Sequence, residues 1–257
     1  VLATGGIIGW FVLLTDEYRR LGLHIVSGAG FVSNFVLWSE AGYFDGDAYT
    51  KPFLHLWSLG IEEQFYIVWP LLLGTVWQRK HHFLGITVSI AALSFLINLY
   101  LIHSNPVAAF YAPWSRFWEL MIGGILAYVA LHRPQYVAAS SNRRSAVGLL
   151  LIVLGVALLN KKAAFPGWWA LLPTLGTFLV IAAGPDAWLN RKFLGSRGMI
   201  GIGLISYPLY LWHWLLLSLA WIVEGEMPSN ATRSVLVLVS LALSYLTYRF
   251  VERRMRR

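Results

Sequence analysis

Long apolar stretches recur along the chain from its first residue to its last, separated by short polar segments. Several of them reach the ~20 residues that an α-helix needs to cross a hydrocarbon core. They cover approximately residues 1–14, 22–38, 54–77, 83–102, 117–131, 146–160, 170–184, 200–223 and 234–251. Because they run through the whole length and leave no separate soluble part, the pattern predicts a single all-α membrane domain over 1–257, a polytopic transmembrane helical bundle of eight or nine spans.

Two of these stretches are less regular than the others. Residues 22–38, GLHIVSGAGFVSNFVLW, are short and rich in small and polar residues, so this stretch either spans the membrane or re-enters it. The first stretch has only 14 residues and begins at Val1. We therefore expect the domain to continue upstream of Val1.

Composition agrees with a membrane environment. The chain is 58% hydrophobic and only 12% charged, whereas a soluble domain carries roughly 25% charged residues. It contains no Cys, which excludes disulfides, thiolate metal ligands and an acyl-cysteine intermediate. We expect no metal site and no tightly bound cofactor.

Lys and Arg are unevenly shared between alternate loops. One set of loops (78–82, 132–145, 185–199 and the tail from Glu252) holds 12 of them, and the other set (39–53, 103–116, 161–169 and 224–233) holds 5. The positive-inside rule then predicts a cytoplasmic C-terminus, an external 39–53 loop and a multi-pass protein of the inner (plasma) membrane. This bias accounts for the net charge of +8, so we expect contacts with membrane lipids and no nucleic-acid partner.

The stretch HLWSLGIEEQFY, residues 55–66, places a His and two adjacent carboxylates at the start of an apolar run. On a helix, His55, Ser58 and Glu62 share one face at i, i+3 and i+7, while Glu63 turns about 100° away. Charges at membrane depth are costly, so Glu62 and Glu63 are candidates for proton-handling groups. They could instead accept structural hydrogen bonds from Arg116 or from the backbone.

Two further segments carry polar groups. In WSRFWELMIGGILAY, Arg116 and Glu119 stand at i, i+3, where the pair is either a structural ion pair or a fork for an anionic ligand. The second segment is SYPLYLWHW, residues 206–214, which contains Pro208. Tyr207 precedes this proline and Tyr210 and His213 follow it, and the three side chains are spaced by about one helical turn. His213 is either a hydrogen-bonded packing residue or a base.

These motifs resemble the acyltransferase 3 family of integral-membrane acyltransferases. HLWSLGIEEQFYIVWPLLL looks like the family signature, and FVSNFVLWSEAGYF, WSRFWELMIGGILAY, FLGSRGMIGIGLISYPLYLWHW and YRFVERRMRR occur in the family's order around it. The family usually begins with two more membrane helices, the first of which carries an Arg and a His central to catalysis, and it usually has a Pro where this chain has Arg254. The resemblance therefore implies a membrane acyltransferase domain that lacks its N-terminal helices.

The resemblance also implies a reaction. The family moves an acyl group, usually acetyl from acetyl-CoA, to a hydroxyl of a carbohydrate acceptor such as a surface polysaccharide. By position, Glu62, Glu63 and His55 would be catalytic. The substrate-binding or pocket-lining residues would be Trp57, Ser58, Arg116, Glu119, Tyr207, Tyr210 and His213.

Two other functions are compatible with the same polar residues. In a proton- or ion-coupled transporter, Glu and His side chains would relay protons or bind a cation, and inverted repeats with matched broken helices would be expected. Without the family's first helices, the chain could also be an inactive fragment.

Overall fold

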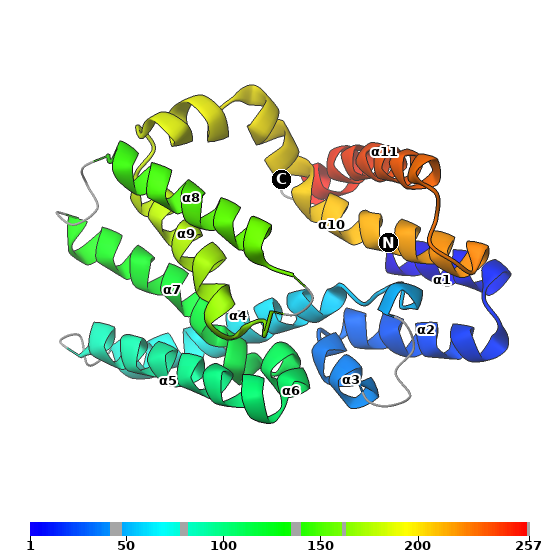
Figure 1. The fold of residues 1–257 in the computed structure, drawn as a ribbon, viewed down its shortest axis with the longest axis horizontal. Coiled ribbons are helices and arrows are strands. Elements are labelled where there is room, and N and C mark those ends of the chain that lie inside the picture. The colour runs from blue at the N-terminus through cyan, green and yellow to red at the C-terminus, as the bar shows by residue number, and fades with distance from the viewer. Residues whose placement is uncertain (42–47, 78–81, 135–139, 161–162, 256–257) are drawn as a thin grey trace. The chain divides into compact units, whose positions relative to one another are not determined.

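The computed structural model describes residues 1–41, 48–77, 82–134, 140–160 and 163–255, and every element in these residues is helical (Figure 1). The α-helices are α1 (Leu2–Val12), α2 (Thr15–Ala29), α3 (Ser33–Glu40), α4 (Leu56–Trp77), α5 (Phe83–Ser104), α6 (Pro106–Tyr111), α7 (Pro113–His132), α8 (Asn142–Leu158), α9 (Leu171–Ala182), α10 (Arg197–Glu224), α11 (Asn230–Thr247) and α12 (Arg253–Met255). Short 3₁₀ turns cover Ala48–Thr50 and Gly167–Ala170, and π-helical turns cover Leu189–Leu194 and Tyr248–Glu252. The predicted all-α class is confirmed for the described residues.

The chain folds into two compact units. Unit 1 combines Val1–Gly60 with Arg197–Arg257, and unit 2 comprises Ile61–Ser196. The first turn of α4 belongs to unit 1 and the rest of that helix to unit 2. Because unit 1 is assembled from the two ends of the chain, motifs far apart in the sequence become neighbours there.

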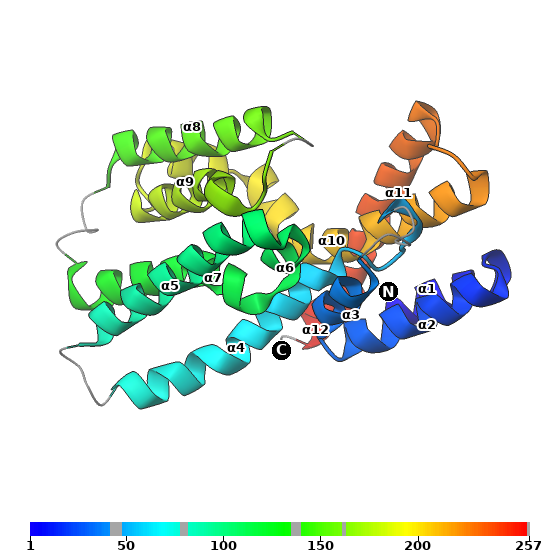
Figure 2. The ribbon, with the colours of Figure 1, turned by 60° about the horizontal axis from the view of Figure 1, so that its bottom comes forward.

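Unit 1 places α1 beside α2 and α10 beside α11 (Figures 1 and 2). Its core is a cluster of buried apolar side chains drawn from both segments of the chain: Leu21, Phe53, Leu56, Trp212, Leu215 and Leu219. Trp212 also donates its indole N–H to Thr247 Oγ1 at 3.0 Å, which ties α10 to α11. This core fixes residues 53–56 against α10.

Unit 2 contains two helix pairs, α5 with α7 and α8 with α9, which lie side by side in both views (Figures 1 and 2). Buried residues of α4, α5, α7 and the 3₁₀ turn before α9 form its core: Phe65, Ala91, Trp118, Met121 and Ala170. Ser94 of α5 supports the first pair, because its hydroxyl donates to the Trp114 carbonyl at 2.7 Å and accepts from the Trp118 N–H at 3.2 Å.

Glycines allow the second pair to pack backbone against backbone. A Cβ placed on Gly148 of α8 would lie 2.6 Å from the Gly176 carbonyl oxygen of α9, and a Cβ on Gly176 would lie 2.8 Å from the Gly148 oxygen. Close approach through small residues is typical of helices that associate in membranes. On α7, a Cβ on Gly124 would meet Trp69 at 2.7 Å, whereas Gly123 has open space around it.

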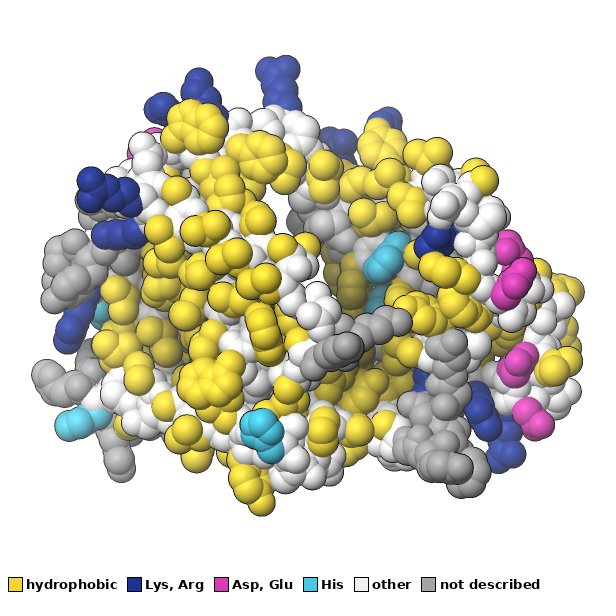
Figure 3. Space-filling view, in the orientation of Figure 1, with side chains coloured by type: hydrophobic (Ala, Val, Ile, Leu, Met, Phe, Trp, Pro, Cys, Tyr) yellow, Lys and Arg dark blue, Asp and Glu magenta, His cyan; other side chains and the backbone are white. Residues whose placement is uncertain are grey.

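Several helices bury polar side chains and expose apolar ones. Helix α5 buries Ser94 and Asn98 but exposes Leu93, Leu96 and Tyr100. Hydrophobic side chains also cover much of the face seen in Figure 3. A surface of this kind suits contact with lipid rather than with water.

Three of the described helical segments are long and apolar enough to cross a membrane: Phe83–Ser104, Arg197–Glu224 and Asn230–Met255. Shorter apolar helices cover Leu2–Val12 and Gly167–Ala182. The apolar helices agree with a membrane protein, and the number of eight or nine spans stays a prediction.

The stretch 22–38 is not one helix. Helix α2 begins at Thr15, where the Glu17 carboxylate accepts the Leu14 N–H at 3.0 Å and acidic residues suit a helix N-terminus. It ends at Ala29, and Phe31 adopts a φ of 56° before α3 starts at Ser33. A side chain rarely adopts this left-handed conformation, so it breaks the helix.

Two details of the helices complete the fold. The outer loop predicted for 103–116 contains α6, which starts at Pro106 with Asn105 accepting the Ala108 N–H at 3.0 Å. Prolines lie inside two of the described helices, Pro70 in α4 and Pro208 in α10.

Candidate active site

His55 reaches the interior of unit 1 through a tightly wound lead-in to α4. Backbone N–H groups of Leu54, Leu56 and Ser58 each bond to the carbonyl three residues earlier, at 3.0 to 3.3 Å. Phe53 and Leu56 on either side of His55 are both core residues. The imidazole between them is consequently buried, with 8% of the residue exposed.

Tyr210 of α10 connects this lead-in to the second polar motif. Its hydroxyl donates a hydrogen bond to the His55 carbonyl and lies 3.0 Å from Ser58 Oγ. Because a carbonyl only accepts and a phenol has one proton, Ser58 is the donor to Tyr210. The His55 and Tyr210 rings also meet edge to face at 4.9 Å between centroids.

His213 completes the cluster one turn along α10. Its ring centroid lies 5.9 Å from that of His55. Its Nδ1 lies 2.9 Å from the Leu209 carbonyl, so a neutral His213 carries its proton on Nδ1. The lone pair is then on Nε2, where a proton can be accepted.

His55 is less completely bonded. The backbone of Leu211 interacts with its ring, yet among the described residues neither ring nitrogen has a partner at hydrogen-bond geometry. A buried polar group without a partner is costly, and a catalytic role is one of the physical explanations for such a group in a native structure. His55, Ser58, Tyr210 and His213 therefore form a candidate site, which we call the His55 cluster.

The other two aromatic candidates of unit 1 lie beside these residues in sequence. Trp57 is half-buried in the first turn of α4, and Tyr207 is exposed on α10, one turn before Tyr210. Their positions alone do not assign either residue a role in the His55 cluster.

Arg116 and Glu119 form the predicted ion pair in unit 2. Their Nη2 and Oε2 atoms lie 3.0 Å apart, and the guanidinium also lies over the rings of Phe110 and Phe165 at 5.9 and 5.5 Å. Both charged residues line a cavity of about 350 Å³ whose other walls, from α7 and α9, are mostly apolar. The pair sits at the polar edge of an otherwise hydrophobic pocket.

Glu62 and Glu63 lie in the unit 2 part of α4. Glu62 is exposed and Glu63 half-buried. Among the described residues neither forms a hydrogen bond or an ion pair, so the alternative in which Arg116 or the backbone binds them finds no support in the described contacts. Their catalytic role stays a prediction.

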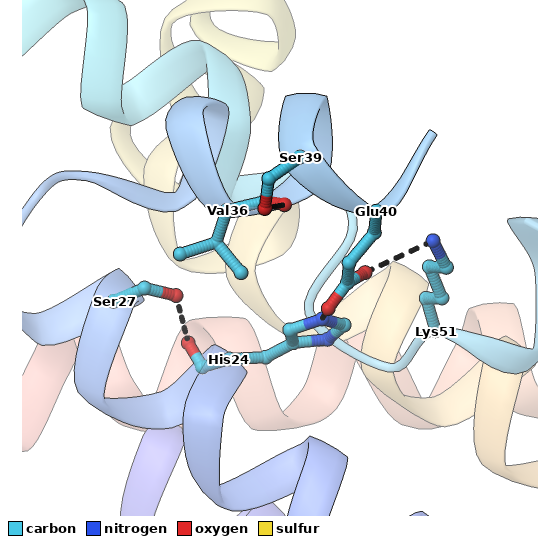
Figure 4. A network of polar contacts seen from close by, with 6 residues as sticks. All are labelled: His24, Ser27, Val36, Ser39, Glu40 and Lys51. Atoms are coloured by element: carbon cyan, nitrogen blue, oxygen red, sulfur yellow. Dashed lines mark hydrogen bonds and ion pairs between the residues drawn. The ribbon is translucent and has the colours of Figure 1, made fainter. Parts of the chain in front are cut away.

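A second polar network in unit 1 escaped the sequence reasoning. Glu40 at the end of α3 binds His24 Nε2 with one carboxylate oxygen at 2.8 Å and Lys51 Nζ with the other at 3.0 Å (Figure 4). The only signal in the sequence was His24 within an apolar stretch, followed by an acid and a Lys in the loop 39–53.

Two opposing effects of its surroundings determine the pKa of the Glu40 carboxyl. Burial alone raises the pKa of the Glu40 carboxyl, but the hydrogen bonds and charges of His24 and Lys51 outweigh burial and lower it below its ordinary value. This carboxylate therefore stays ionised at neutral pH. In the described part of the chain no cluster of His, Asp and Glu is suited to a metal ion.

Comparison with known proteins places these residues in context. Residues 6–249 match the model of a family described as an acyltransferase domain. The chain is 29% identical over 253 residues to the provisionally named membrane-bound transacylase BcsY of Komagataeibacter xylinus. The aligned region covers 98% of this chain and 63% of that protein. It is 28% identical over 242 residues to the peptidoglycan O-acetyltransferase OatA of Listeria monocytogenes, covering 88% of this chain and 39% of that protein.

A provisionally named O-acetyltransferase of Staphylococcus aureus strain COL is 26% identical over 258 residues, covering 94% of this chain and 42% of its own length. The chain thus spans from about two fifths to just under two thirds of these relatives. No solved structure matches it.

Proposed function

This chain belongs to the acyltransferase family that its residues 6–249 match, and from that premise we propose that it acts as an integral-membrane O-acyltransferase. In this proposal it moves an acyl group, most simply acetyl, from acyl-CoA to a hydroxyl of a surface polysaccharide. The family match carries the proposal. The structure supports it by bringing two motifs of the family resemblance, HLWSL and SYPLYLWHW, together in the His55 cluster.

The reaction needs a base for the acceptor hydroxyl and hydrogen-bond donors for the thioester carbonyl oxygen. The acceptor oxygen attacks the thioester carbonyl, the C–S bond breaks, and the hydroxyl proton passes to a base and then to the departing CoA thiolate. Donors near the carbonyl oxygen stabilise the negative charge that develops there.

We assign proton handling to the histidines of the cluster. His213 presents Nε2 as an acceptor because Nδ1 is bonded to the helix backbone, and His55 has ring nitrogens without a partner among the described residues. Tyr210 is a positioning residue, since its hydroxyl is used in holding the His55 carbonyl and Ser58. Glu62 and Glu63 are assigned a supporting acid–base role and Trp57 and Tyr207 the lining of the acceptor path.

In the same proposal the protein lies in the plasma membrane with its C-terminus in the cytoplasm. Acyl-CoA from the cytoplasm would then supply the acyl group for an acceptor on the outer side, with membrane lipids around the helices. Arg116 and Glu119 lie at the outer end of α7 in this orientation, so they are assigned to the acyl end of the donor, with the apolar pocket beside them taking up the acyl or pantetheine part.

The test measures transfer of label from radiolabelled acetyl-CoA to cell-surface glycan, released as an alkali-labile ester. In the full-length protein, we expect Glu62→Gln and Glu63→Gln to reduce transfer by about 10² to 10⁴, the range for removal of an acid–base participant, while the protein still accumulates in the membrane. Glu226→Gln, in the exposed turn before α11, is the matched control and should transfer at the wild-type rate.

Two outcomes would contradict the proposal. Wild-type transfer by both glutamate variants would reduce Glu62 and Glu63 to packing residues. Solute or proton flux in liposomes without any acyl-CoA consumption would replace the acyltransferase by a transporter.

A further inference from the structure

A pocket of about 430 Å³ lies in unit 1 around the second polar network. Its walls come from the end of α1, one face of α2, the end of α3, residues 50–52 and the end of α10. We call it the Glu40 pocket. Its volume falls within the range of sites that hold small ligands, about 300 to 1,000 Å³.

Hydrogen bonds and ion pairs fix the polar side chains in the inner part of the Glu40 pocket. Glu40 bonds to both His24 and Lys51, and His24 is buried with 5% exposed (Figure 4). Both oxygens of the Glu40 carboxylate are engaged, one by each partner, which fixes its orientation. Each of those oxygens retains further acceptor capacity for a ligand.

The charges that line the Glu40 pocket balance. Glu17 and Glu40 contribute two negative charges, and Arg20 and Lys51 contribute two positive ones, with His24 and Thr50 as further polar residues. A phosphate or carboxylate would face two carboxylates, and a metal cation would face the Lys and Arg. A neutral molecule with many hydroxyl groups can donate to the carboxylates and accept from the cations at once.

An apolar wall stands beside these polar groups. Leu13, Leu21, Pro52 and Ile222 also line the pocket. A sugar ring has hydroxyl groups around its edge and C–H groups on its faces, so it matches a lining of this mixed kind.

The Glu40 pocket is coupled to the His55 cluster by a clamped segment of chain. Trp214 donates its indole N–H to the Lys51 carbonyl at 2.9 Å, Ser218 Oγ donates to the Tyr49 carbonyl at 2.6 Å, and Tyr49 stacks on Trp221 at 4.6 Å. Lys51 and His55 are four residues apart, so their Cα atoms are separated by no more than about 14 Å. A molecule bound by Lys51 is thereby held within reach of the cluster.

We propose that the Glu40 pocket binds one neutral sugar ring of the acceptor. This inference rests on the proposed acyltransferase function and adds to it a binding site for the acceptor outside the His55 cluster. The position agrees with the predicted orientation, in which the loop 39–53 and the end of α10 near Ile222 face outwards.

Binding is tested without any acyl donor, by saturation-transfer NMR on the whole protein in nanodiscs. The probes are N-acetylglucosamine and methyl β-glucoside as neutral sugars, and inorganic phosphate and Ca²⁺ as charged competitors. We expect the neutral sugars to bind, the competitors to leave that binding unchanged, and Glu40→Gln to weaken it at least tenfold.

Two variants guard against misreading a folding defect. Leu13→Trp fills the pocket without touching the Glu40 network and should abolish sugar binding in a protein that elutes like the wild type. Asp16→Asn, on the same helix as Glu17 but outside the pocket lining, should bind sugar normally.

The binding site and the reaction can fail separately. Sugar binding that depends on Glu40 in a protein that consumes no acyl-CoA would keep the Glu40 pocket and overturn the acyltransferase proposal. Acyl transfer in which Glu40→Gln and Leu13→Trp both leave the acceptor KM unchanged would overturn the pocket and keep the enzyme. Displacement of the sugar by phosphate or Ca²⁺ would also overturn the inference.

Discussion

The backbone contact between α8 and α9 predicts that a single methyl group at Gly148 destabilises unit 2. In Gly148→Ala the new Cβ would lie 2.6 Å from the Gly176 oxygen and 2.9 Å from both the backbone nitrogen and Cγ2 of Val180. Two of these three atoms belong to the backbone, so no rotamer change relieves the contact. The helices must separate by several tenths of an ångström along their whole interface.

The size of the effect follows from two opposing contributions. Overpacking a well-packed interface costs typically 1 to 3 kcal/mol, and a clash with backbone belongs at the upper end, about 3 kcal/mol. Replacing Gly by Ala inside a helix returns about 1 kcal/mol through helix propensity. The net loss is therefore about 2 kcal/mol, roughly a 30-fold shift of the unfolding equilibrium.

Gly176→Ala should behave in the same way, because its Cβ would meet the Gly148 oxygen at 2.8 Å and Ile152 Cγ1 at 2.7 Å. The double variant should lose less than the sum of the two, since helices already separated by one methyl accommodate the second more easily. The measurement is unfolding in mixed detergent micelles, followed by tryptophan fluorescence.

Gly85→Ala on α5 is the matched control, because a Cβ there meets nothing within 4 Å. It should be as stable as the wild type or slightly more stable. If Gly148→Ala were equally stable, the reasoning from backbone contact would be refuted and α8 and α9 would not approach so closely.

Three further predictions concern topology, pH and the His55 cluster. A reporter fused after Arg257 should read cytoplasmic and one inserted in 39–53 external, and the opposite readings would reverse the orientation. Folding lowers the pKa of Glu40, so its ionised carboxylate stabilises the protein above about pH 4.5, and this stabilisation is lost as the pH falls through the pKa of the folded state. In melting experiments the wild type should therefore lose its advantage over Glu40→Gln on acidification. Tyr210→Phe leaves two partners of the lost hydroxyl unsatisfied and should cost about 1 to 3 kcal/mol of unfolding free energy, whereas Tyr100→Phe on the exposed face of α5 should cost almost nothing.

Local spacing explains which contacts could be predicted from the sequence. The Arg116–Glu119 pair was predictable because residues three apart on one helix are neighbours whatever surrounds them. Local spacing does not separate Gly124, where a Cβ would meet Trp69 of another helix, from the open position at Gly123.

Contacts between residues far apart in the sequence could not be predicted from local spacing. No local pattern joins Tyr210 to His55, which lie 155 residues apart, and only the family resemblance put both in one site. The Glu40 network was missed because it depends on the break at Phe31, which turns α3 so that Glu40 meets His24. A positive φ at a Phe has no signature in sequence, whereas Gly would have indicated it.

The division of unit 1 between the two ends of the described chain has a consequence for biosynthesis. Leu21, Phe53 and Leu56 emerge from the ribosome long before Trp212, Leu215 and Leu219, their partners in the core, and all of unit 2 is made in between. During that interval the early helices, with the buried His24 and His55, have no α10 to cover them and must wait in the translocon or in lipid. Unit 2, made without interruption, can complete its own packing first, so a nascent chain arrested before α10 should contain a protease-resistant unit 2 beside an unprotected first segment.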